Sequence, residues 1–130
     1  MRNSNKVIEY VTDTHPLIWF VTNNKSLSQK AKELFLDSNN HIHIPILVII
    51  ETNYLYHKGK ISCSGNDLKS DIECLDHWHL QDFTIELFDY CLTELSIHDA
   101  MICAYAIQNN LSVITKDQEI VNHPKIQSAW

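Results

Sequence analysis

The stretch from Ser96 to Asp117 constrains the fold most, because its pattern predicts one helix followed at once by one buried strand. Ser96 and Asp99 have the N-cap and N3 spacing of a capping box, with Asp in place of the usual Glu or Gln. The asparagine pair 109–110 can take the left-handed conformation that ends a helix, and segment 111–115 (LSVIT) is typical of a strand. A helix of about 12 residues and a strand of about 5 have nearly the same length, so an antiparallel return brings Asp117 beside Asp99.

The rest of the chain alternates between predicted strands and predicted helices. The strand segments are rich in β-branched and aromatic residues and comprise residues 6–12, 41–46, 80–83, 111–115 and 126–130. The helical segments comprise residues 16–21, 28–36, 47–57, 67–78, 84–95 and the helix after Ser96. In segment 84–95, Leu87, Phe88 and Cys91 are expected to face the core. The alternation predicts an α/β fold, a single-domain three-layer sandwich over residues 1–130 with helices flanking a mostly parallel central sheet.

Four acidic residues are expected at one edge of this sheet. Asp13 and Asp117 each follow a strand, Glu51 lies early in the helix after another strand, and Asp99 begins a helix that runs back to the same edge. In α/β folds the carboxyl ends of the strands are where sites form. Taken singly, each acid also has an ordinary structural role, because helix dipoles favour acids in the first turn and Asp is common in turns.

Considered together, the four acids predict a site for divalent cations. Unpaired carboxylates a few ångströms apart repel one another unless they are protonated or bridged by cations, and Arg2 is the one arginine in the sequence. Oxygen ligands without sulfur or imidazole suit Mg²⁺ or Mn²⁺, and two such ions about 4 Å apart stabilise both the attacking and the leaving oxygen of a phosphodiester displacement. No Ser, Cys or His stands in a motif typical of a nucleophile, so we expect attack by metal-activated water.

Four segments together resemble a known family. They are DTHPLIWF at Asp13, IIETNYLYHKGKI around Glu51, HDAMICAYA at Asp99 and ITKD at Asp117. In this order they are similar to the PIN domain, specifically to the VapC-like toxin ribonucleases, and the resemblance covers nearly the whole chain. Residues 62–83 match none of the family's motifs.

The resemblance implies a fold, an activity and partners. The fold is a central parallel sheet flanked by helices, and the activity is a Mg²⁺- or Mn²⁺-dependent endoribonuclease that cleaves single-stranded RNA. The metal-binding acids implied are Asp13, Glu51, Asp99 and Asp117, with Thr115 as a supporting hydroxyl. The partners implied are a second copy of the chain, which makes a homodimer, and an antitoxin whose tail blocks the site.

Charge and composition bound the protein's class. The net charge of −6 and the pI near 5.7 speak against a broad basic footprint for nucleic acid, although acids that hold cations are neutralised when the cations bind. Lys58, Lys60 and Lys116 are the lysines expected to steer RNA, or else to be isolated surface charges. Scattered cysteines without a CxxC pair, no signal-peptide core and no membrane-spanning run lead us to expect a cytoplasmic protein with reduced core cysteines and no membrane partner.

Three other functions are compatible with parts of the pattern. The pairs His41/His43 and His77/His79 have the spacing that places two imidazoles on one face of a strand, but no cysteine or carboxylate in the sequence completes a zinc set. A receiver-type signalling domain would have an acidic pair at the first strand end, where Asp13 stands alone. A catalytically inert PIN-fold module that binds protein or RNA would keep the core and lose acids, whereas all four acids are present.

Overall fold

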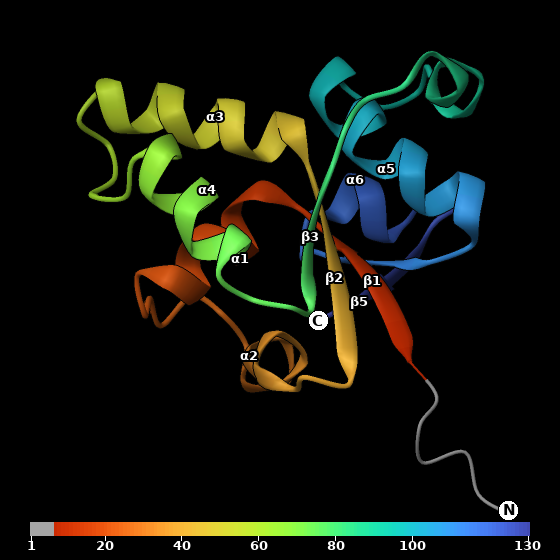
Figure 1. The fold of residues 1–130 in the computed structure, drawn as a ribbon. Coiled ribbons are helices and arrows are strands. Elements are labelled where there is room, and N and C mark those ends of the chain that lie inside the picture. The colour runs from red at the N-terminus through yellow and green to blue at the C-terminus, as the bar shows by residue number, and fades with distance from the viewer. Residues whose placement is uncertain (1–6) are drawn as a thin grey trace, which may run out of the picture.

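A central sheet of five parallel strands organises the chain in the computed structural model, which describes residues 7–130 (Figure 1). The spatial order is β3-β2-β1-β4-β5, and every neighbouring pair runs parallel. The strands are β1 (Ile8–Thr12), β2 (Asn40–Pro45), β3 (Trp78–Gln81), β4 (Ser112–Ile114) and β5 (Gln127–Ala129). The predicted α/β fold with a parallel sheet is therefore confirmed. Arg2 and the expected start of the first strand at residue 6 lie outside the described residues.

Helices cover both faces of the sheet and complete the three layers (Figure 1). One layer consists of α1 (Thr14–Val21), α2 (Gln29–Leu36), α3 (Ile46–His57) and α4 (Gly65–Glu73). The opposite layer consists of the 3-10 helix η1 (Ile85–Tyr90), α5 (Ile97–Asn109) and α6 (Gln118–Val121). None of the helices within residues 7–130 is long and apolar enough to cross a bilayer.

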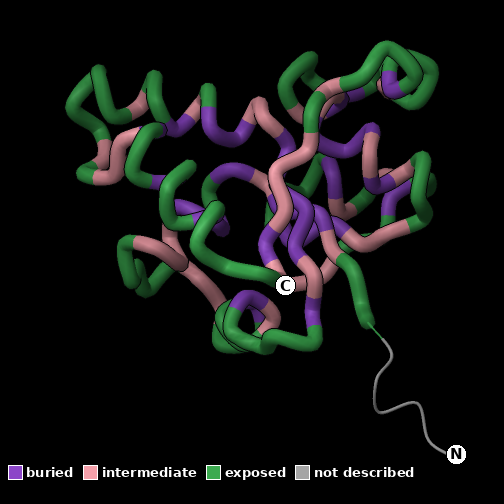
Figure 2. The backbone as a smooth tube through the Cα atoms, in the orientation of Figure 1, coloured by how far each residue is buried: buried purple, intermediate pink, exposed green. Residues whose placement is uncertain are grey.

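Alternation along the strands divides the buried side chains between two cores, and the buried residues follow the central strands (Figure 2). Ile42 and Ile114 point into the core under α1 to α4, where they join Trp78. Val11 and Val113 point into the core under α5 and α6. Because successive strand residues face opposite sides, one run of β-branched residues supplies both cores.

The pairing of β1 with β4 sets the geometry of the sheet edge at which these strands end. Thr12 lies opposite Ile114, and the Asp13 amide donates to the Ile114 carbonyl at 3.1 Å. The helix α5 packs on both strands and ends at Asn110, which has a left-handed backbone (φ 57°). The chain then returns antiparallel to α5 through β4, as the sequence predicts, and reaches this edge again. We call the carboxyl edge of β1 and β4, together with the start of α5, the rim.

Two predicted segments differ from the structure in extent because of Trp78. The helix predicted for residues 67–78 is α4, which ends at Glu73. Trp78 is only 5% exposed and packs edge-on against Phe20 and Phe35, so it belongs to the sheet. The strand predicted for residues 80–83 accordingly begins two residues earlier, at Trp78.

The helix predicted for residues 84–95 is wrong. The chain forms the short 3-10 helix η1 and then becomes extended at Cys91. Leu87 is buried, but Ile85 and Phe88 are 87% and 75% exposed, so the apolar residues form no single buried stripe and Phe88 does not face the core. The helix α6 escapes sequence analysis for a different reason, since four residues are too few to show a helical period.

The four cysteines form no disulfide within the described residues. Cys103 is buried and Cys63 and Cys91 are half-buried, whereas Cys74 is exposed at the end of α4. The expectation that all four are core residues is therefore wrong for Cys74.

Candidate metal centre

Asp13 is fixed at the rim by hydrogen bonds to both carboxylate oxygens. It is the N-cap of α1, and its Oδ1 accepts from the Thr14 amide at 2.8 Å. Its Oδ2 accepts from the hydroxyl of Thr115, at the end of β4, at 2.8 Å. Burial raises the pKa of Asp13 above its ordinary value, the charges of Asp117 and Glu51 add to that rise, and the two hydrogen bonds oppose it. The side chain is thus held in place at some electrostatic cost.

Thr115 also positions the second acid of the rim. Its side chain is fully buried, and its hydroxyl oxygen accepts from the Asp117 amide at 3.0 Å. Asp117 in turn caps α6, because its Oδ1 accepts from the Glu119 amide at 2.9 Å. One threonine hydroxyl therefore connects Asp13 with the turn that carries Asp117.

Asp99 reaches the rim from the first turn of α5. The Ser96 hydroxyl caps this helix by accepting from the Asp99 amide at 3.3 Å, as the capping-box spacing predicts. The pKa of Asp99 is raised from 3.8 to about 6, first by burial and then by the charges of Asp13 and Asp117. A carboxyl with such a pKa is in an environment that favours a positive charge nearby.

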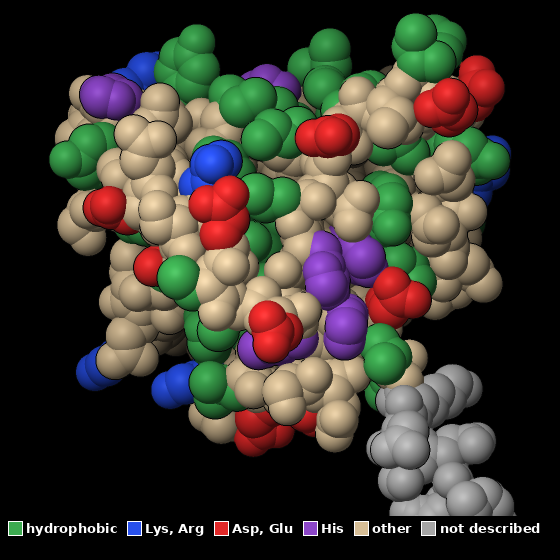
Figure 3. Space-filling view, viewed as in Figure 1, with side chains coloured by type: hydrophobic (Ala, Val, Ile, Leu, Met, Phe, Trp, Pro, Cys, Tyr) green, Lys and Arg blue, Asp and Glu red, His purple; other side chains and the backbone are tan. Residues whose placement is uncertain are grey.

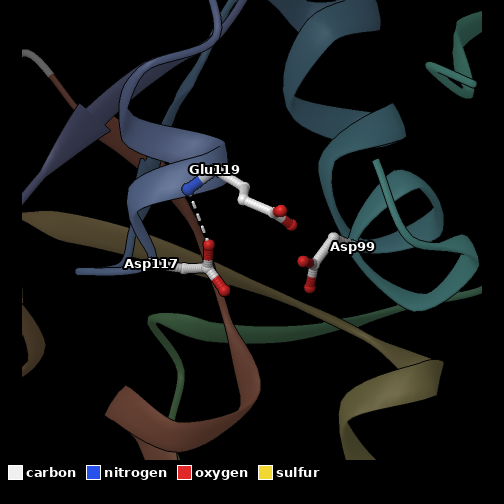
Figure 4. A group of neighbouring side chains, drawn as sticks. All are labelled: Asp99, Asp117 and Glu119. Carbon is white, nitrogen blue, oxygen red and sulfur yellow. Dashed lines mark hydrogen bonds between the residues drawn. The ribbon is translucent and has the colours of Figure 1, made fainter. Parts of the chain in front are cut away.

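The structure adds a fifth acid, Glu119, which sequence analysis missed. Asp99, Asp117 and Glu119 each place one carboxylate oxygen within 4.8 Å of the others, and their side chains converge on a common space (Figure 4). Within residues 7–130, no other three side chains of His, Cys, Asp or Glu bring potential ligand atoms this close together. The available sequence signal was weak: an acid two residues after Asp117, which is ordinary for the first turn of a helix.

Glu51 lies at the side of this group instead of within it. Its carboxylate accepts from the Thr14 hydroxyl and lies 3.1 Å from Nδ1 of His98. It is nevertheless close enough for its charge to contribute to the raised pKa values of Asp13 and Asp99. The four acids predicted from the sequence therefore meet at the rim electrostatically, with Asp99 and Asp117 converging directly and Asp13 and Glu51 alongside.

The chemistry of the donor set fits a hard divalent cation. The converging groups are carboxylates supported by threonine hydroxyls, and oxygen ligands are those that Mg²⁺ and Mn²⁺ prefer. Among the ion pairs of the described residues, none joins a lysine to these acids. The nearest sulfur is unsuitable, because burial and the neighbouring acids raise the pKa of Cys103 and keep it a thiol.

Family comparison decides the class of the fold. The PIN domain family matches residues 10–126, which include every acid of the rim. The chain belongs to the PIN domain family. The resemblance found in the sequence is thereby confirmed, and the receiver-domain alternative is wrong. Among curated proteins, none matches the chain.

Solved structures share this PIN fold at low sequence identity. A chain of VapBC2 from Rickettsia felis, bound to a DNA fragment from the promoter, is 20% identical, with a TM-score of 0.69 over 94% of this chain and 98% of that one. A chain of DNA-bound VapBC from Salmonella typhimurium is 18% identical, with a TM-score of 0.67 over 95% and 98%. VapC20 from Mycobacterium tuberculosis, a toxin that cleaves the sarcin-ricin loop, is 14% identical, with a TM-score of 0.60 over 92% and 98%. These likenesses establish a shared fold.

The raised pKa of Asp99 predicts a pH dependence of stability in the metal-free PIN domain. A folded-state pKa of about 6 against an ordinary 3.8 means that this group's stabilising contribution is complete below the lower value and is lost as pH rises through the higher one. We therefore expect Asp99→Asn to become progressively more stable than the wild type between about pH 4 and about pH 7. Urea unfolding in EDTA measures this difference.

The matched control is Asp71→Asn, an exposed acid on α4. Its stability relative to the wild type should stay nearly constant over the same pH range. A difference between Asp99→Asn and the wild type that does not change with pH would mean that the pKa of Asp99 is not raised in the folded protein.

Proposed function

We propose that this PIN domain is a divalent-metal-dependent endoribonuclease that cleaves single-stranded RNA and serves as the toxin of a toxin–antitoxin pair. The observation that carries the proposal is the convergence of Asp99, Asp117 and Glu119, with their oxygens within 4.8 Å of one another and Asp13 alongside. Such an arrangement is unfavourable without a cation, so selection for stability alone does not explain it.

The residues of the rim supply ligands and orientation in this proposal. Asp99, Asp117 and Glu119 would hold one Mg²⁺ or Mn²⁺, and Asp13 and Glu51 would complete its surroundings or hold a second ion. A bound ion supplies neutralisation of the phosphodiester charge and activation of water. Thr115 orients Asp13 through its hydrogen bond to Oδ2 and acts as a positioning residue.

No side chain at the rim is suited to attack phosphorus itself. The hydroxyls of Thr14 and Thr115 both donate to carboxylates, to Glu51 and Asp13 respectively. The Cys103 thiol is buried, and its pKa is raised. Water is therefore the nucleophile that this site supports.

A path for RNA is supported by three shallow hollows that all include His15. One lies between α1 and α3 and is lined by Glu51, Lys58 and His98. The second is lined by Trp19 and Lys60. The third is lined by Asp13, Asp117, Thr115, Trp19 and Lys116. Each lysine expected to steer RNA thus lines a different one of these hollows, and His15 is common to all three, which gives an acidic protein a local basic path.

We propose that a base of the RNA stacks on the ring of Trp19 in this path. The Lys116 ammonium lies 5.1 Å from the centre of the Trp19 ring, and His15 packs 5.7 Å from that ring on another side. An aromatic ring beside a cation is the combination that single-stranded nucleic acids use, because the ring stacks on a base while the cation meets a phosphate. The hollow shared with Asp13 and Asp117 would place the stacked nucleotide next to the scissile bond.

Exposed apolar side chains support the protein partners in this proposal. Ile50 and Tyr54 on α3 are 45% and 65% exposed and line the hollow beside Glu51, a position from which an antitoxin segment would block the site. Ile85, Phe88 and Ile97, on the packed pair η1 and α5, are 72–87% exposed and suit contact with a second copy. Structures of VapBC complexes with a similar fold favour the antitoxin as a partner. The competing function is an inert PIN module that binds RNA or protein without cutting.

Metal dependence is the first test. Mn²⁺ bound only to the native state should raise the melting temperature, and at about 100 times the dissociation constant the gain in unfolding free energy is about 2.7 kcal/mol. Chelation with EDTA should abolish cleavage of single-stranded RNA. Cleavage that persists in EDTA, or a melting temperature indifferent to Mn²⁺, would contradict the metal mechanism.

The second test removes individual ligands. Asp99→Asn and Glu119→Gln should each lower the rate of RNA cleavage with Mn²⁺ roughly 100-fold or more, because each removes a carboxylate from the ion. Both variants should keep the fold, and Asp99→Asn should lose no stability, since it removes a charge beside Asp13 and Asp117. Asp71→Asn provides the control and should cleave normally. Near-normal cleavage by Asp99→Asn would favour the inert module or a purely structural role in capping α5.

The third test separates RNA recognition from chemistry. Trp19→Leu should raise KM for single-stranded RNA and leave kcat nearly unchanged, with an effect that corresponds to about 1–3 kcal/mol for one lost base stack. Phe88→Leu, an exposed aromatic on η1, is the control and should not change KM. If Trp19→Leu lowers kcat with no change in KM, Trp19 supports the rim instead of binding the base.

A further inference from the structure

A group of polar side chains covers part of the sheet face that α5 leaves open. Glu9 of β1 lies opposite His41 of β2, and His43 of β2 lies opposite His79 of β3, so all four point to the same face. Histidine side chains gather on this face of the molecule (Figure 3). We call Glu9, His41, His43, His79 and Gln81 the histidine patch. It is separate from the rim, because it lies on β2, β3 and the start of β1, whereas the rim lies at the carboxyl ends of β1 and β4.

His41 and His79 direct ring nitrogens at each other. Nδ1 of His41 lies 2.7 Å from Nε2 of His79, and the rings are stacked with centroids 4.8 Å apart. Such a contact needs one nitrogen to donate and the other to accept, so at least one lone pair points into the space between the rings. Both rings are half-buried and remain open to solvent on one side.

His43 holds the neighbouring carboxylate in place. Its Nδ1 lies 2.7 Å from the amide nitrogen of Gln81, which can only donate, so Nδ1 accepts. Its Nε2 therefore carries the proton and donates to Glu9 Oε1 at 2.7 Å. His43 is 7% exposed, and Tyr105 packs on it with centroids 5.0 Å apart. Glu9, which comes from a third strand, is therefore bonded to His43, and the nitrogens that His41 and His79 direct at each other remain the potential ligands.

We propose that the histidine patch binds a borderline divalent transition ion, with Zn²⁺ as the type ion, through two protein ligands, His41 Nδ1 and His79 Nε2. Imidazole nitrogen favours Zn²⁺, Ni²⁺ and Cu²⁺, whereas the oxygen donors of the rim favour Mg²⁺ and Mn²⁺. Zinc–nitrogen distances of about 2.0–2.1 Å in a tetrahedral site separate two nitrogens by roughly 3.3 Å. The two nitrogens therefore have to move apart by about 0.6 Å from their present contact, and the ring that donates in this contact has to carry its proton on its other nitrogen.

The contact between His41 and His79 joins β2 to β3. An ion held between β2 and β3 would also fasten β3, the edge strand of the sheet on this side.

Zinc binding by untagged protein tests this proposal. The rim is disabled by working in the Asp99→Asn, Asp117→Asn double variant, so that the remaining sites report separately. Calorimetric titration with Zn²⁺ should give one site per chain, and Co²⁺ should give the visible absorption of a nitrogen-coordinated ion. His41→Gln and His79→Gln should each weaken binding more than tenfold, because losing an outer-shell partner already costs about 10–100-fold. His57→Gln, an exposed histidine on α3, is the control and should bind as before.

Each outcome decides the question. Loss of Zn²⁺ binding in both patch variants, with binding retained in His57→Gln, supports the site. Unchanged binding in His79→Gln, or binding lost with Cys74→Ser instead, places the ion elsewhere and overturns the proposal. If a patch variant fails to fold, proton NMR of the parent double variant still decides, because Zn²⁺ must shift the ring resonances of His41 and His79 and leave those of His57 unchanged. Failure here leaves the nuclease proposal standing, since the rim is not involved.

Discussion

The parallel pairing of β1 with β4 is the contact on which the rest of the rim depends. It allows the Asp13 amide to donate to the Ile114 carbonyl, so that the residues following the two strands, Asp13 and Thr115, lie at the rim. The Thr115 hydroxyl uses this proximity to bond Asp13 and the Asp117 amide at once. A shift of register by one residue would turn Thr115 to the other face of the sheet and remove its bond to Asp13.

The two hydrophobic cores supply the stability that offsets the repulsion between the acids at this edge of the sheet. Buried Ile, Leu and Val side chains on both faces of the sheet fix α5 and the β4 turn, so the acids cannot move apart to relieve their repulsion. The result is a carboxyl, Asp99, with a pKa of about 6 at a half-buried position. A raised pKa of this kind is typical of functional sites, where a bound ligand stabilises the charged carboxylate. In the proposed function, the same arrangement would let an acidic protein act on a polyanion, since the negative charge is concentrated where the proposed cations would bind.

The class of fold and most of the rim can be predicted from the amino-acid sequence. Alternating apolar segments predict the strands and helices, and local signals such as the Ser96 cap and the Asn110 left-handed residue mark where α5 begins and ends. Since parallel strands all end at one edge, the order of segments alone brings Asp13, Asp99 and Asp117 together. These features depend on neighbours in the chain, which is why they can be recognised without coordinates.

Tertiary structure decided what depends on residues far apart in the sequence. Glu119 joins the acids only because the β4 turn points the short helix α6 at α5, and Glu51 is drawn aside by Thr14 and His98 from two other helices. The contact between His41 and His79 spans two strands, and Glu9 arrives from a third. Sequence spacing places side chains on a face but does not choose which strands become neighbours. That choice follows from packing the whole set of helices on the sheet, as the burial of Trp78 against Phe20 and Phe35 shows.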